Sequence, residues 1–164
     1  MLKEACSSGE FVAAQLGHDR ERFIELGQFL RATPPSSVVT IARGSSDHAA
    51  NYAAYLMMAR LGHIVASLPM SLVTLNKAPL QVKNALAIAI SQSGQSPDVV
   101  EPIRYFREHG ATTVALVNDA ASPLAQGAQW TMPLHAGPEL SVAATKSFIT
   151  SLVAGARLAG HWQN

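Results

Sequence analysis

Three serines lie close together in the segment Ser91-Gln92-Ser93-Gly94-Gln95-Ser96. This segment follows an apolar run at 85–90 that predicts a buried strand, and it precedes Pro97, which suits the first position of a helix. Such a turn presents free backbone N–H groups and the positive end of a helix dipole, here together with three hydroxyls. The arrangement fits an anion, and a phosphate monoester is the best-fitting common metabolite group. The alternative is a plain capped turn, because serine is also a good N-cap.

Two other loops have the same small, hydroxyl-rich character. Residues 43–47 read Arg-Gly-Ser-Ser-Asp and follow a β-branched run at 38–42, and residues 135–146 follow a shorter run at 130–134. Because ligands of open α/β sheets bind beyond the carboxyl ends of the strands, we expect the three loops to lie together. Gly44 would let the backbone approach a ligand, and Ser45 and Ser46 could donate to phosphate or sugar hydroxyls. One of these two serines is also expected to cap the following helix.

Ionisable side chains flank these loops, and each has a structural alternative. Arg43 could neutralise a phosphate bidentately or form a surface salt bridge, and the sequence supports both alternatives. His48 could titrate usefully beside the first loop, although a position on a helix surface is the simpler interpretation. Glu139 and Lys146, at a spacing of seven, are expected to share a helix face as an ion pair or a sugar contact. Alternatively, Glu139 only favours the helix N-terminus.

Several familiar site types are absent from the sequence. No Gly-Lys-Ser/Thr follows a spaced glycine, and no Gly-x-Gly-x-x-Gly follows the first predicted strand. The six histidines show no ligand pair at helical spacing, and the single cysteine, Cys6, is remote, so we predict no metal and no cofactor. The loop at 118–123 has the composition of an ordinary turn.

The composition indicates one globular domain with a substantial core. The chain has 164 residues, of which 48% are hydrophobic and 14% charged, and its formal net charge is +1. Without a basic run, nucleic acid is disfavoured as a partner. No stretch has the apolar length of a membrane span, so no membrane association is expected. A lone thiol favours a reducing compartment, and the cytoplasm is the expected location.

The elements that position the three loops alternate along the chain. Strands are predicted at 38–42, 64–68, 86–90, 112–117 and 130–134, and helices at 4–16, 20–30, 47–61, 97–109 and 139–161, with short turns of helix at 71–75 and 123–126. Short β-branched runs separated by helices predict an α/β fold. We expect a three-layer α/β/α sandwich with a five-stranded parallel sheet, flavodoxin-like, over residues 36–164, preceded by a helical extension at 1–35.

The three loops together resemble those of the sugar isomerase (SIS) domain family of phosphosugar-binding proteins. The specific parts are Ala42-Arg43-Gly44-Ser45-Ser46, the serine segment at 91–96 and Ser141-Val142-Ala143-Ala144-Thr145-Lys146. The resemblance is strongest to the isomerase half of glucosamine-6-phosphate synthase and to glucosamine-6-phosphate deaminase-type proteins. It implies a hexose 6-phosphate that carries an amine as the ligand, and a homodimer.

The resemblance also implies roles for individual residues. Ser45, Ser91, Ser93 and Ser96 would hold the phosphate with Gln92 beside it, and Ser46 and Val142 would contact the sugar. We expect no glutaminase domain, and the first loop reads Arg43-Gly44-Ser45-Ser46 where the synthase type resembles Cys-Gly-Thr-Ser. Both differences favour aldose–ketose isomerisation or deamination over glutamine-dependent synthesis.

The family's catalytic residues belong to a second SIS domain, and none can be assigned in this chain. We therefore expect either the first half of a two-domain enzyme or a single-domain relative that self-associates. A sugar-phosphate sensor without catalytic activity explains the same loops. A nucleotide-binding flavodoxin-like protein is disfavoured because the loops lack its aromatic and acidic features.

Overall fold

A parallel β-sheet forms the centre of the molecule. The structure is a computed structural model that describes residues 2–139 and 144–164. Within these residues the sheet has five strands, all parallel, in the order β2-β1-β3-β4-β5. They are β1 (Val38–Ile41), β2 (Val65–Ser67), β3 (Leu86–Ser91), β4 (Thr112–Val117) and β5 (Trp130–Pro133). Every strand end lies within one residue of its predicted position, and the predicted fold class is confirmed.

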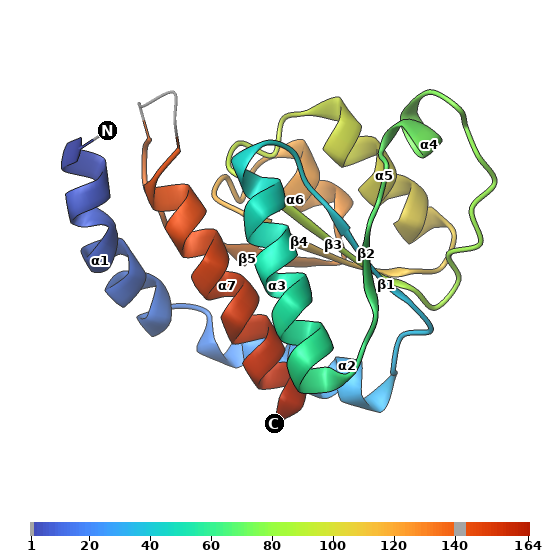
Figure 1. Cartoon of the computed structure of the whole chain (residues 1–164), viewed down its shortest axis with the longest axis horizontal. Coiled ribbons are helices and arrows are strands. Elements are labelled where there is room, and N and C mark those ends of the chain that lie inside the picture. The colour runs from blue at the N-terminus through green and yellow to red at the C-terminus, as the bar shows by residue number, and fades with distance from the viewer. Residues whose placement is uncertain (1, 140–143) are drawn as a thin grey trace.

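Helices cover both faces of the sheet and complete three layers (Figure 1). On one face lie α2 (Arg20–Ala32), α3 (Ser45–Leu61) and α7 (Lys146–Gln163), with α1 (Leu2–Gly17) packed outside α7. On the other lie α4 (Ser71–Thr74), α5 (Pro97–Glu108) and α6 (Pro123–Gly127). The alternation along β3 divides the core, since Leu86 and Ile88 pack on the α3 side while Ala87 and Ala89 pack on the α5 side. No described helix is both long and apolar enough to cross a bilayer.

Close helix packing on the first face depends on small residues. A Cβ atom on Gly155 of α7 would lie 2.8 Å from the Ala53 Cβ of α3, and one on Gly27 of α2 would lie 2.1 Å from the His161 carbonyl oxygen of α7. Helix α2 is thereby held against the core, where Phe23 and Leu26 are fully buried. Helix α2 shares this core with the rest of the fold. The division of the chain into an extension and a domain at residue 35 stays a prediction.

One predicted helix boundary is wrong. The last helix, α7, begins at Lys146 and not at 139, seven residues later than predicted. The other helix ends agree with the predicted ranges within two residues. Glu139 lies outside the helix and binds the beginning of α7 through its side chain, as described below.

Substitution of Gly27 by alanine tests the close approach of α2 and α7. The new methyl would meet backbone atoms of His161, which cannot move without shifting α7. We expect Gly27→Ala to lower the free energy of unfolding by about 1–3 kcal/mol in denaturant titrations. Gly9→Ala in α1 is the matched control, since its Cβ would meet nothing within 4 Å. Equal stabilities of the two variants would contradict this packing.

Candidate functional site

The serine loop after β3 is a tightly folded turn. Ser91 Oγ accepts a hydrogen bond from the Gly94 N–H at 3.0 Å, and Ser93 Oγ accepts one from the Gln95 N–H at 3.3 Å. Gly94 has φ +64°, and a Cβ there would lie 2.2 Å from Ser122 Oγ. The loop therefore requires glycine at 94 both for its backbone conformation and for its contact with the start of α6.

Ser96 occupies the N-cap position of α5, and its side chain does not cap the helix. Its carbonyl accepts hydrogen bonds from the N–H groups of Val99 and Val100, and Pro97 is the first helical residue, as predicted. The alternative of a plain side-chain-capped turn is thus not what the structure shows at this helix. The Ser96 hydroxyl is left available to a ligand at the positive end of α5.

The loop after β1 also ends at a helix N-terminus. Gly44 is the N-cap residue of α3, with φ 57° and ψ −133°, a conformation that only glycine adopts readily. Ser45 and Ser46 are the first two residues of α3, so the expectation that one of them caps this helix is wrong. A capping side chain must come from the residue before the helix, and that residue is Gly44.

The two loops line one cavity of about 320 Å³. Seven of the eight residues proposed from the sequence line it, namely Gly44, Ser45, Ser46, Ser91, Gln92, Ser93 and Ser96. The eighth, Val142, lies outside the described residues, but Ala144 from the same loop lines the cavity. The structure thus brings residues from all three predicted loops together at the carboxyl edge of the sheet. That they bind a ligand stays a prediction.

Arg43 is the one charged side chain among the described residues that line this cavity. Its Nη1 forms an ion pair with Asp98 Oδ2 at 2.5 Å, and the two side chains are 58% and 32% exposed. The salt bridge weighed as an alternative from the sequence is therefore present. Its partner could not be identified from the sequence, because the two residues are separated by 55 positions.

Glu139 caps the N-terminus of α7. Its Oε1 accepts hydrogen bonds from the N–H groups of Thr145 at 2.5 Å and Lys146 at 2.7 Å, and its Oε2 accepts one from the Ser147 hydroxyl. Burial raises the pKa of Glu139, but the hydrogen bonds from Ser147, Thr145 and Lys146 outweigh burial and leave the pKa below its ordinary value. The expectation that Glu139 and Lys146 share a helix face is wrong, and the helix-terminus alternative is correct.

Lys146 is turned away from Glu139 and is buried. Its Nζ donates to the Pro138 carbonyl at 2.7 Å and lies 4.2 Å from the centroid of the Phe11 ring in α1. Only 5% of this residue is exposed. Both its charge and its donors therefore serve the loop that precedes α7, and the residue is not in a position to contact a sugar from a helix face.

The loop after β4, which the sequence suggested was an ordinary turn, supports its neighbours. The Asn118 side chain donates to the Gly137 carbonyl at 2.9 Å and accepts from the Ala136 N–H at 2.8 Å, which ties it to the loop after β5. Ser122 packs on Gly94 and caps α6. These contacts fix the described base of the third loop, at 135–139, and the back of the serine loop. The alternation of predicted strands and helices along the sequence does not indicate these side-chain contacts.

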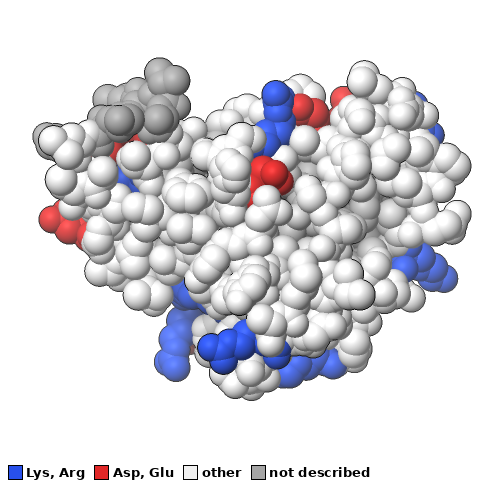
Figure 2. Space-filling view, viewed as in Figure 1, with Lys and Arg blue, Asp and Glu red and all other residues white. Residues whose placement is uncertain are grey.

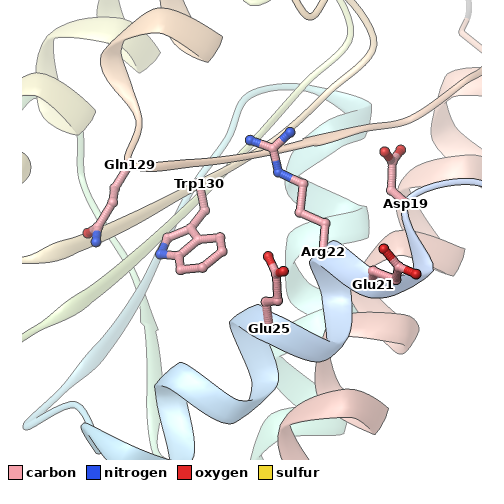
Figure 3. A pocket seen from close by; sticks show the side chains of 6 residues that line it. All are labelled: Asp19, Glu21, Arg22, Glu25, Gln129 and Trp130. Atoms are coloured by element: carbon pink, nitrogen blue, oxygen red, sulfur yellow. The ribbon is translucent and has the colours of Figure 1, made fainter.

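A second hollow, of about 540 Å³, runs along the edge strand β5 and α2. Figure 3 shows Arg22 and Glu25 extending from α2 towards the strand that carries Trp130. Asp19, Glu21 and Glu25 give this hollow three carboxylates beside the single arginine, which disfavours a phosphate. None of the residues predicted for the site lines it. Among residues 2–139 and 144–164, no three His, Cys, Asp or Glu side chains are grouped to hold a metal ion.

Comparison with known proteins settles the family. The SIS domain model matches residues 33–159. The chain belongs to the SIS domain family. This SIS domain is 32% identical over 162 residues to a glutamine–fructose-6-phosphate aminotransferase (isomerizing) of Thermus thermophilus, a match that covers 97% of the chain and 27% of the aminotransferase. The chain thus spans about a quarter of that relative's length.

Solved structures share the fold of this SIS domain. A candidate phosphosugar isomerase from Silicibacter pomeroyi DSS-3 superposes with a TM-score of 0.95 at 46% identity, over 98% of this chain and 49% of that chain. The Vibrio vulnificus NanR protein, complexed with ManNAc-6P, superposes with a TM-score of 0.83 at 20% identity, over 97% of this chain and 60% of that one. The first supports homology to phosphosugar isomerases, and the second shows the fold alone.

Replacement of Glu139 by glutamine tests the cap on α7. The variant loses the charge that strengthens the hydrogen bonds from Thr145, Lys146 and Ser147. We expect Glu139→Gln to lower the free energy of unfolding at pH 7 by about 1–3 kcal/mol. Glu10→Gln, on the exposed middle of α1, is the control.

The same pair of variants gives a pH signature. Because folding lowers the pKa of Glu139 from 4.5, its contribution is complete above that pH and is lost as the pH falls through the lower folded value. The stability difference between wild type and Glu139→Gln should therefore shrink on acidification. A difference that is constant from pH 7 to pH 3 would contradict the assignment of the carboxylate as the cap.

Proposed function

We propose that this SIS domain binds the phosphate group of a hexose or amino-sugar 6-phosphate. The observation that carries the proposal is the convergence of two hydroxyl-rich loops on one cavity beside the N-termini of α3 and α5, where Ala144 of the third loop joins them. Hydroxyls and backbone N–H groups are the hydrogen-bond donors that a phosphate monoester requires, and the positive ends of helix dipoles favour its negative charge. In this proposal Ser45, Ser91, Ser93 and Ser96 hold the phosphate with Gln92 beside it.

The sugar would extend from the phosphate towards α3 and the loop before α7. Ser46 lies one residue further along α3 than Ser45, and Ala144 marks the side of the cavity to which the third loop contributes. We propose that Ser46 and Val142 contact the sugar chain. Gly44 leaves the backbone open here, since a Cβ at this position would meet nothing within 4 Å.

The proposed reaction is aldose–ketose isomerisation or deamination of the glucosamine 6-phosphate to fructose 6-phosphate type. Opening of the ring and transfer of a proton between C1 and C2 need a general acid and a general base. Among the described residues that line the cavity, only Arg43 is ionisable, and a guanidinium is a poor base. We therefore propose that a second SIS domain, from the same protein or from a second copy, supplies these groups.

The surface of α3 offers a place for that second domain. Tyr52, Tyr55 and Met58 are 42%, 67% and 44% exposed along this helix. Figure 2 shows few charged side chains on the face formed by α3 and α7. An exposed apolar helix face beside a binding cavity is typical of an interface, and the Silicibacter pomeroyi structure is about twice as long as this chain.

A role as a sugar-phosphate sensor is the second candidate. It is favoured by the same lack of a general base among the described cavity residues and by the NanR structure, in which a protein of this fold is complexed with ManNAc-6P. Release of ammonia from glucosamine 6-phosphate distinguishes the two candidates. Binding without turnover by the full-length native protein would favour the sensor.

Replacement of Ser96 by alanine tests the phosphate assignment. If its hydroxyl donates to a charged group, Ser96→Ala should weaken binding of glucosamine 6-phosphate and fructose 6-phosphate by roughly 1–3 kcal/mol. Calorimetric titration measures this change. Ser36→Ala, before the opposite end of the sheet, is the matched control and should bind as wild type does. An unchanged affinity of Ser96→Ala would remove Ser96 from the site, and no heat with either sugar phosphate from folded wild type would overturn the proposed function.

A further inference from the structure

Arg43 lies between two cavities. It lines the candidate phosphate cavity, and it also lines a larger hollow of about 740 Å³ that is bounded by α4 and the start of α5. Asp98, its ion-pair partner, lines only the second hollow. The Asp98 carboxylate is therefore not among the groups that line the candidate phosphate cavity. A ligand phosphate in that cavity and Asp98 would both be drawn to the same cation.

The contact between Arg43 and Asp98 leaves hydrogen-bonding groups of both side chains without a partner in this pair. A guanidinium has five N–H donors arranged to bind both oxygens of a carboxylate, but the pair here is made by Nη1 and Oδ2 alone. Asp98 Oδ1 is buried without a hydrogen-bond partner among the described residues. Since the Arg43 side chain is 58% exposed, an ion pair of this kind contributes little and opens at low cost.

The charged side chains in and near the cavity indicate which ligand group Arg43 can bind. A phosphate monoester carries close to two negative charges at neutral pH, and serine hydroxyls supply hydrogen bonds but no positive charge. Asp98 adds a negative charge in the first turn of α5, and Asp47 adds one in the first turn of α3. Glu101, one turn further along α5, lies 3.6 Å from Lys77. Among the described residues that line the cavity, Arg43 is thus the one cation that a phosphate could use, and Asp98 competes for it.

We propose that Arg43 gives the cavity its selectivity for a doubly charged 6-phosphate. Asp98 holds the guanidinium when the cavity is empty, and the guanidinium turns to the phosphate when a sugar phosphate binds. This inference rests on the proposed function and deepens it, because it assigns charge recognition to a residue outside the serine loop. It also makes Asp98 a competitor of the ligand, so that loss of Arg43 and loss of Asp98 have opposite effects on affinity.

Two ligands of the same shape and different charge test the inference. Glucosamine 6-phosphate and glucosamine 6-sulfate differ mainly in that the sulfate carries a single negative charge. We expect Arg43→Ala to weaken binding of the phosphate by about tenfold or more and of the sulfate by less, so that the phosphate-to-sulfate preference falls. Arg43→Lys keeps the charge and should retain most of the preference. Asp98→Asn should bind the phosphate about three- to tenfold more tightly than wild type.

Arg60→Ala, in the last turn of α3, is the matched control and should leave both affinities unchanged. Circular dichroism and thermal melts establish that each variant is folded. If Arg43→Ala and Asp98→Asn weaken binding by the same factor, or if Arg43→Ala leaves the phosphate-to-sulfate preference unchanged, the ion pair is structural and the inference is overturned. Wild type that binds neither ligand would overturn the proposed function and this inference with it.

Discussion

The parallel pairing of β1 with β3 is the constraint on which the site depends. Val38 lies opposite Leu86 and Ile41 lies opposite Ala89, so β1 ends two residues before β3 does. Continued at this register, the chain reaches Arg43 at the level of Ser91. Both strands then turn directly into helices, α3 and α5, whose N-termini are brought to the same place. A shift of this register would move the loop at 43–47 away from the serine loop at 91–96, and the cavity between them would be lost.

Support for the loops comes from residues that do not line the cavity. Ser122 fills the space behind Gly94, and Glu139 binds the N-terminus of α7. Asn118 binds the backbone N–H of residue 136 and the carbonyl of residue 137. These side chains bond mainly to the backbone. The Ser91 and Ser93 oxygens accept hydrogen bonds within their own loop, and their O–H groups can still donate to a ligand. The division between supporting and lining residues is what a preorganised binding site requires.

The elements of the fold were predictable because their signals are local. Five short apolar or β-branched runs separated by helical periodicity predicted the strands to within one residue, and two small, hydroxyl-rich loops supplied the seven predicted residues that line one cavity. The start of α7 was not predictable from periodicity, since Glu139 lies in a loop and reaches the helix through its side chain. The Arg43–Asp98 pair and the Asn118 contacts join segments far apart in sequence, so only the tertiary structure shows them.

The proposal that the three loops form a sugar-phosphate site has a direct test in solution. Backbone amide chemical shifts, followed by NMR during titration with glucosamine 6-phosphate and with unphosphorylated glucosamine, locate the ligand and identify the group that holds it. We expect the phosphorylated sugar to shift the amides of residues 44–46 and 91–96, which surround the cavity, and glucosamine to leave them unchanged. Shifts confined to the hollow beside Trp130, or equal shifts with both sugars, would contradict it.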